Sequence, residues 1–442
     1  MSTQDRLVQL SAGPEAGGAA VDGQEALVPL SPWPAPRNAV RSYHAMIKPI
    51  GSICNLDCTY CYYLHKEDLL GSPSKFRMSD EILEAHIRQY IEGQDGPEVV
   101  FTWQGGEPTL LGLGFFEKAV ELQTRYKKPN QRIENDLQTN GTLLDEEWAR
   151  FLRDHNFLVG LSIDGPKHLH DAYRVAKNGS PTFDRVFAAS QLLHKHHIRF
   201  NTLTVVNRVN ARRPLDVYRF LRSEVRPREM QFIPCVEPKV FCTVAPQKWD
   251  PRMLAEYDSP AAHPGNPDSV VTDWSVDPDD WGYFLCKVWD DWYSRDYGKQ
   301  FVNLFETAVA QWMGMEAQLC IYHDFCGKGV ALEHDGSLYA CDHYVYPEYR
   351  LGNIQETSSS RMVFSDRQRE FGFAKSKTLP QYCRECKYLF ACNGECPRNR
   401  LIRTPSGEPG LNYLCKGLHK FWSHIDPDMK EIVRRVQSER SP

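Results

Sequence analysis

Three cysteines within eight residues constrain this chain more than any other feature of its sequence. Cys54, Cys58 and Cys61 lie in the segment ICNLDCTYCYY with the spacing C-x3-C-x2-C. Two disulfides need four cysteines, and a closed tetrahedral zinc site needs four ligands. The segment therefore predicts a site that is one protein ligand short, unless His65 supplies a fourth ligand to zinc.

Composition limits the classes of protein to which the chain can belong. It has 442 residues, 41% of them hydrophobic, which is enough for two or three domains that fold without disulfides. Its 52 basic and 57 acidic residues leave a formal net charge of -5, which gives no attraction to nucleic acid or an anionic membrane. The sequence shows neither a signal peptide nor an apolar run of roughly 18 to 20 residues that would cross a membrane. We therefore expect a cytoplasmic protein whose residues 1–40 form a disordered leader.

The remaining cysteines point in the same direction. In a reducing compartment, thiols are more often metal ligands or redox groups than disulfides. A second group of eight follows in the last third of the chain: Cys320, Cys326, Cys341, Cys383, Cys386, Cys392, Cys396 and Cys415. Three cysteines stand apart, and we expect each to be a small buried hydrophobic residue: Cys235, Cys242 and Cys286.

Short strand-like runs alternate with helical patterns between the two cysteine groups. The sequence predicts six strands, over residues 44–50, 98–103, 132–139, 157–163, 198–206 and 229–235. It predicts helices between them, from the N-cap Ser79 to Gly93 and over 144–154, 184–197 and 214–224. Repeated units of this length indicate an α/β fold with a parallel sheet, either open or curved into a partial barrel. In both cases the chemistry takes place at the carboxyl ends of the strands, where the cysteine trio lies.

The second half of the chain is divided by composition. Residues 240–280 are rich in Pro, Asp and Ser, as in a linker or long loop, and a helical stretch from about 280 to 316 follows. Asp335-Gly336 predicts the turn of a small hairpin, and a final helix is expected over 416–438. We expect a leader, a core, a linker with a helical connection, a cysteine-rich domain and a C-terminal helix, over residues 1–40, 41–239, 240–316, 317–416 and 417–442.

A glycine-rich loop, Gln104-Gly105-Gly106-Glu107-Pro108, follows the second predicted strand. Two glycines let the backbone approach a ligand closely, and the Glu107 carboxylate could bind an ammonium group. The same residues could form an ordinary tight turn. The position of the loop, beside the cysteine trio in the expected sheet, favours a binding role.

CNLDCTYC followed by QGGEP resembles the radical S-adenosylmethionine (SAM) enzymes, and the eight later cysteines resemble the SPASM extension. The resemblance covers about residues 44–420 and implies a partial (β/α)6 radical SAM barrel followed by a small cysteine-rich SPASM domain with two auxiliary clusters. It implies that Cys54, Cys58 and Cys61 hold a [4Fe-4S] cluster whose open iron binds S-adenosyl-L-methionine. Two further [4Fe-4S] clusters would be held by Cys320, Cys326, Cys341 and Cys396, and by Cys383, Cys386, Cys392 and Cys415.

Within this superfamily the chain is most similar to the anaerobic sulfatase-maturating enzymes. The similarity rests on CDHYV at 341–345, LGNI at 351–354, SIDGP at 162–166 and QFIPC at 231–235. It implies an oxidoreductase that converts a Cys or Ser of a sulfatase to Cα-formylglycine by means of a 5'-deoxyadenosyl radical. The implied partners are an unfolded sulfatase polypeptide with a Cys/Ser-x-Pro-x-Arg segment and a low-potential electron donor such as flavodoxin or ferredoxin.

The resemblance also assigns roles to single residues. Asp342 is the expected base because it follows a ligand of the first auxiliary cluster, although it could be a carboxylate that only makes hydrogen bonds there. Partial burial should raise its affinity for a proton. Tyr63 and Gln104 are expected to face substrate and cofactor, and Ser162 and Asp164 to lie beside S-adenosylmethionine.

Two other functions remain open from the sequence. The first is a SPASM enzyme that modifies a ribosomally made peptide by a thioether or carbon-carbon cross-link or by epimerisation. The second is an interaction protein built from zinc ribbons. The sequence does not decide whether a sulfatase target would be Cys or Ser.

Overall fold

The protein is described by a computed structural model that covers residues 42–63, 66, 77–240 and 250–440. The expected leader, His65 and Cys242 lie outside the described residues. No helix in the described part of the chain is long and apolar enough to span a bilayer.

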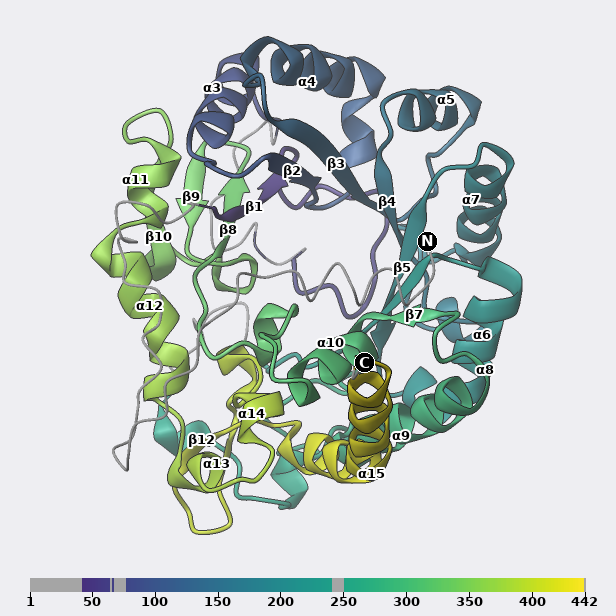
Figure 1. Cartoon of the computed structure of the whole chain (residues 1–442), viewed down its shortest axis with the longest axis vertical. Helices are drawn as coiled ribbons and strands as arrows, with labels where there is room; N and C mark the ends of the chain where they lie inside the picture. The colour runs from purple at the N-terminus through teal and green to yellow at the C-terminus, as the bar shows by residue number, and fades with distance from the viewer. Residues whose placement is uncertain (1–41, 64–65, 67–76, 241–249, 441–442) are drawn as a thin grey trace.

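A curved sheet of ten strands dominates the structure (Figure 1). All six predicted strands are present and pair side by side in parallel: β1 His44–Lys48, β2 Glu98–Trp103, β3 Arg132–Thr139, β4 Leu158–Ser162, β5 Phe200–Val206 and β6 Glu229–Pro234. The strand order runs linearly from β10 to β7, so the sheet does not close on itself. Because the sheet nevertheless curves around a central space (Figure 1), the fold is a partial barrel and not a flat open sheet.

Helices cover the outer face of the curved sheet (Figure 1). They are α3 Asp80–Glu92, α4 Leu113–Tyr126, α5 Glu146–Asp154, α6 Lys167–His170, α7 Phe183–Lys195 and α8 Pro214–Phe220. As predicted, Ser79 caps α3, and its hydroxyl accepts a hydrogen bond from the Ile82 amide. The sequence did not predict α4, because its N-cap is Gly112, which offers no side chain to mark the start.

The cysteine-rich segment extends the same sheet. β8 Gly329–Glu333 pairs in parallel with β1, and β9 Ser337–Tyr339 and β10 Arg350–Asn353 follow as antiparallel neighbours. The predicted hairpin turn is confirmed, with Gly336 at φ 82°. The pairing of β8 with β1 was not predicted, and it brings the two cysteine groups to one edge of the barrel.

The open side of the barrel is crossed by the second half of the chain (Figure 1). The helical stretch predicted over 280–316 is two helices, α9 Pro278–Arg295 and α10 Asn303–Trp312, separated by the short strand β7 Phe301–Val302. Short segments follow: α11 Ser359–Val363, α12 Asp366–Lys377, α13 Gln381–Arg384, α14 Leu389–Cys392 and the pair β11 Ile402–Arg403 and β12 Pro409–Leu411. The predicted last helix is α15 Cys415–Arg440.

α9 and α15 pack closely because each has a glycine at the crossing. A Cβ on Gly417 would lie 2.0 Å from the Pro278 carbonyl oxygen, and one on Gly282 would lie 2.7 Å from that of Gly417. Only glycine allows backbones to approach this closely. The contact holds α15 against the barrel and fixes Cys415 at its first turn.

Candidate active site

The cysteine trio lies on a loop directly beyond β1 and is held by backbone hydrogen bonds. The Leu56 amide is 3.4 Å from the Cys54 Sγ atom, and the Cys61 amide donates to the Cys58 carbonyl oxygen at 2.9 Å. All three cysteines are free thiols. Burial raises the pKa of the Cys54 and Cys58 thiols to about 11, so these groups become thiolates only when a positive charge binds them.

The donor set fits an iron-sulfur cluster better than a single ion. Within the described residues, no three His, Cys, Asp or Glu side chains converge on a point that could hold one metal ion. A [4Fe-4S] cluster spreads its cysteine ligands over separate irons, so its ligands need no common point. Three cysteines on one loop, with no other metal-binding side chain among residues 42–63 and 77–240 converging on them, fit a cluster with one open iron.

The glycine-rich loop is packed against the cysteine loop. A Cβ on Gly106 would lie 1.9 Å from the Ile53 carbonyl oxygen, and Gly105 has φ +123°. The amides of Gly106 and Glu107 donate to the carbonyl oxygens of Gly51 and Ile53 at 2.8 and 2.9 Å. The protein's own backbone thus approaches these glycines closely, and their contact with a cofactor stays a prediction.

The Glu107 carboxylate is buried and hydrogen-bonded within the protein. It is completely buried, and it accepts hydrogen bonds from the Thr109 hydroxyl at 2.6 Å, the Thr139 hydroxyl at 2.8 Å and the Asn140 amide at 2.7 Å. Both oxygens are thus occupied by groups at the ends of β2 and β3. Glu107 thereby ties the two loops together, and its predicted contact with an ammonium group stays a prediction.

Asp164 is the centre of a buried network beside the cysteine loop. Its carboxylate accepts hydrogen bonds from the Tyr60 hydroxyl and, at 3.0 Å, from the Val205 amide. Arg174 donates to the Tyr60 hydroxyl at 2.8 Å and lowers the pKa of the Cys58 thiol against the larger effect of burial. No local sequence pattern pointed to Arg174. Asp164 thus orders this network, and its place beside S-adenosylmethionine stays a prediction.

Ser162 and Gln104 occupy the positions that were predicted for them. Ser162 is the last residue of β4 and is partly exposed, with its hydroxyl accepting a hydrogen bond from the Gln138 amide group at 2.9 Å. Gln104 follows β2, and its backbone amide donates to the Ile47 carbonyl oxygen at 2.8 Å. Both residues stand at the carboxyl edge of the sheet, and their contact with a cofactor stays a prediction.

Asp342 is held by residues from the other cysteine group. Lys48, the last residue of β1, forms a buried ion pair with it, and the Tyr62 hydroxyl donates to it at 2.5 Å. The Lys48 ammonium group lies 4.3 Å from the centre of the Tyr63 ring, and the Tyr63 hydroxyl donates to Glu333 on β8. Tyr63 therefore lies in the same network. Lys48 could have been found from the sequence, because a charged residue that ends a buried strand points to the catalytic edge.

The pKa of Asp342 is not raised as expected. Burial alone would raise it, but Lys48 and His343 outweigh burial and hold the pKa of this carboxyl at about 2. The prediction of a raised proton affinity is wrong because it did not include the ammonium group of Lys48. At neutral pH the side chain is a carboxylate, the form that a proton acceptor needs.

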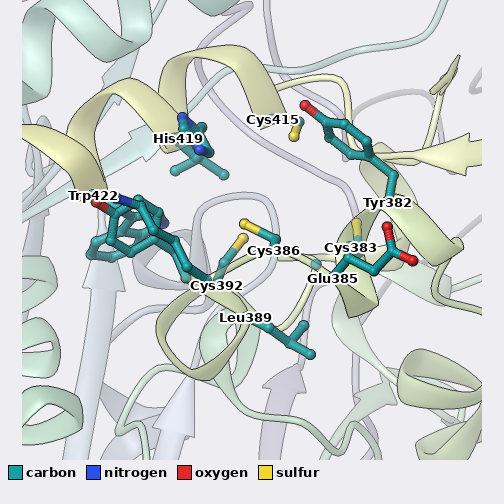
Figure 2. A pocket seen from close by; sticks show the side chains of 13 residues that line it. Tyr382, Cys383, Glu385, Cys386, Leu389, Cys392, Cys415, His419 and Trp422 are labelled. Atoms are coloured by element: carbon teal, nitrogen blue, oxygen red, sulfur yellow. The ribbon is translucent and has the colours of Figure 1, made fainter. Parts of the chain in front are cut away.

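The eight later cysteines separate into two sets. Apart from burial, the pKa of the Cys341 thiol is raised by Cys320, Cys396 and Cys326, which shows that these four lie near one another. The other four line a cavity of about 480 Å³ with Tyr382, His419 and Trp422 around it, and their sulfur atoms point into it (Figure 2): Cys383, Cys386, Cys392 and Cys415. The sets match those predicted. Cys235 and Cys286 are buried, as expected.

Fold and site define the class of protein. A partial barrel with a three-cysteine loop after its first strand belongs to the radical SAM superfamily, which matches residues 49–221, and an iron-sulfur cluster-binding SPASM domain matches residues 325–387. The chain is 44% identical to the serine-type anaerobic sulfatase-maturating enzyme of Bacteroides thetaiotaomicron, over 90% of this chain and 93% of that one. It is 34% identical to the cysteine-type enzyme of Clostridium perfringens, over 89% and 98%.

A solved structure shows the same relationship. The structure described as native anSMEcpe with bound AdoMet is 33% identical and has a TM-score of 0.75, covering 88% of this chain and 99% of that one. The chain belongs to the anaerobic sulfatase-maturating enzymes.

Proposed function

We propose that this enzyme oxidises a Cys or Ser residue in an unfolded sulfatase segment to Cα-formylglycine, with Asp342 as the base. The observation that carries the proposal is the position of Asp342. It follows Cys341 of the later cysteine group and is bound by Tyr62, the residue after Cys61 of the first group. One ionised carboxylate thus links the loop of Cys54, Cys58 and Cys61 to the segment that holds Cys341 of the first auxiliary set.

The cofactor would be held by residues of the barrel. Cys54, Cys58 and Cys61 would bind the cluster, with Ser162 and Gln104 beside S-adenosylmethionine. Bound there, the cofactor supplies a 5'-deoxyadenosyl radical, which takes a hydrogen atom from the substrate Cβ. Arg174, buried next to Cys58, places a positive charge against the thiolate ligands. It would offset part of the negative charge that three thiolates bring into a buried site.

The protein completes a two-electron oxidation of the substrate. After the hydrogen atom is lost, the substrate must release one proton and one more electron to become a thioaldehyde or an aldehyde. Asp342 would take the proton, and Lys48 and Tyr62 would keep its carboxylate ionised and oriented. The eight later cysteines would hold the two auxiliary clusters, whose chemistry is electron transfer.

The substrate class follows from the relatives. Other solved structures of anSMEcpe contain AdoMet with a Cp18Cys or a Kp18Cys peptide. We infer that this enzyme likewise accepts a peptide segment with the Cys/Ser-x-Pro-x-Arg sequence, and that it acts in the cytoplasm, where its thiols stay reduced.

The test uses two peptides that differ only at the target residue. Reconstituted enzyme, S-adenosylmethionine and dithionite are incubated without oxygen with a Cys or a Ser peptide, and a peptide with Ala at the target is the control. Aldehyde detected by mass spectrometry, together with 5'-deoxyadenosine, is expected for at least one of the first two. Cofactor cleavage with no aldehyde from either peptide would refute the proposal and favour modification of another peptide.

A further inference from the structure

A surface groove reaches the cysteine loop at Asn55. It has a volume of about 380 Å³ and is lined by Asn55, by residues of the segment 176–181 and by Arg185 from α7. Neither the proton acceptor nor the proposed cofactor contacts are among its residues. Tyr63, at the far end of the same loop, is only 3% exposed and faces the interior. The groove therefore opens at the surface next to the residue that follows Cys54.

The wall of the groove is fixed to the cysteine loop by backbone hydrogen bonds. The Asp57 amide donates to the Val175 carbonyl oxygen at 2.8 Å, and the Thr59 amide donates to that of Tyr173 at 3.0 Å. The chain then turns back on itself, with the Ala176 amide donating to the Ser180 carbonyl oxygen at 2.9 Å. The turn is thus a rigid extension of the loop that carries the trio.

One residue that lines the groove is adjacent in sequence to a proposed cluster ligand. Asn55 lines the groove and directly follows Cys54. Its side chain is held on both sides, because the Asn140 amide group donates to it and it donates to the Thr142 hydroxyl, both at 2.9 Å. Leu143, the next residue, is 37% exposed and adds apolar surface at this face.

The groove carries a positive charge. Lys177 and Arg185 are exposed, and within the described residues neither forms an ion pair. Nearby, the Asp184 carboxylate is paired with Lys167, and Asp57 is the exposed acidic residue of the cysteine loop. The residues that line the groove include these two cations and no carboxylate, which favours a partner with an acidic surface.

We propose that this groove docks an acidic, low-potential electron-carrier protein that delivers the electron needed for each turnover. The inference rests on the proposed function, which requires a one-electron reductant. One electron would leave the reduced flavin or iron-sulfur group of the carrier and enter the site held by Cys54, Cys58 and Cys61. The carrier is left oxidised by one electron, and no proton crosses. Complexes of this kind have small interfaces, and their affinity falls as the salt concentration rises.

The experiment reverses the two charges and measures binding and turnover. Full-length, reconstituted K177E/R185E is titrated with oxidised flavodoxin as the probe. The matched control is R88E/R361E, which changes the net charge equally on α3 and α11, across the molecule from α6 and α7 (Figure 1). We expect a Kd at least tenfold weaker for K177E/R185E and unchanged for the control, with a weaker salt dependence for K177E/R185E. Aldehyde formation should fall at least tenfold with reduced flavodoxin and stay unchanged with dithionite.

Two results would overturn the proposal. Equal flavodoxin binding by both double variants would show that the groove is not the docking site, and aldehyde formed with dithionite would still support the proposed function. A raised KM for the sulfatase peptide in K177E/R185E, measured with dithionite, would mean that the groove binds the client polypeptide instead. Failure of the wild type to form aldehyde with dithionite would refute the proposed function alone, because flavodoxin binding is measured separately.

Discussion

The hydroxyl of Tyr62 donates a 2.5 Å hydrogen bond to the carboxylate of Asp342, although 280 residues separate them in the sequence. The bond joins the loop that ends the first cysteine group to the turn that follows Cys341. It exists because β8 pairs with β1 and carries the second cysteine group to the edge of the barrel. The proposed base therefore comes from one half of the chain and lies beside the cysteine loop of the other half.

Replacing Asp342 by Asn should separate the two parts of the reaction. The amide keeps the size of the side chain but cannot take a proton, so aldehyde formation should fall by about 10²- to 10⁴-fold. Formation of 5'-deoxyadenosine should fall much less. Both products are quantified by chromatography, with D335N in the hairpin turn as the control. Equal loss of both products in D342N would refute the role of base.

Replacing Gly106 by Ala should disrupt the cysteine loop. The added Cβ would lie 1.9 Å from the Ile53 carbonyl oxygen, and backbone atoms there cannot move without shifting Cys54. We expect a loss of about 3 kcal/mol in the free energy of unfolding and a loss of the iron bound by this loop. Gly114 on α4 has no neighbour within 4 Å of a Cβ and is the control. If G106A and G114A bound iron equally well, the packing argument would be wrong.

Replacing Cys415 by Ala should prevent binding of one iron-sulfur cluster. Its thiol lines the cavity shared with Cys383, Cys386 and Cys392 (Figure 2). We expect C415A to bind about four fewer irons per chain than the wild type. C286A, which removes a buried thiol outside both groups, should bind as much iron as the wild type. Iron and sulfide analysis of reconstituted protein gives the answer, and an unchanged iron content in C415A would contradict the assignment.

Asp136 should make the protein less stable as the pH rises. Burial and, secondarily, Glu134 raise the pKa of this β3 carboxyl from 3.8 to about 6. The folded state therefore holds the proton more tightly than the unfolded chain, and the stability this contributes is present below pH 4 and lost between about pH 4 and 6. D136N should lack this decline, which we expect to be about 3 kcal/mol. Urea unfolding of both proteins at pH 4 to 7 measures the difference, and parallel curves would exclude it.

The features that repeat along the chain could be predicted from the sequence. The six parallel strands follow the prediction because each is a local strand-like run, and the C-x3-C-x2-C spacing of the first cysteine group is local as well. The division of the eight later cysteines into two sets of four came from the resemblance to the SPASM extension, because Cys396 joins a set whose other members lie far earlier in the chain. α4 was missed because glycine replaces the usual capping residue at its start.

Features that depend on contacts between residues far apart in the chain could not be predicted from the sequence. The Glu107 carboxylate is tied to Thr139 and Asn140, and Arg174 reaches Tyr60, because strands far apart in the chain become neighbours. The pKa of Asp342 was predicted in the wrong direction for the same reason: its ammonium partner, Lys48, is almost 300 residues earlier in the chain. A charge that compensates for burial is visible only once the fold is known.

Because β8 of the hairpin pairs with β1, the two halves of the enzyme complete one sheet and must fold together. If translation stopped before Gly329, β1 would be left as a bare sheet edge, with the backbone donors and acceptors that now pair with β8 open to any passing strand. The nascent chain would have to be shielded from self-association until its last third emerged. We therefore expect the chain from Gly329 onward to protect β1 from such pairing, in addition to supplying the proposed cluster ligands.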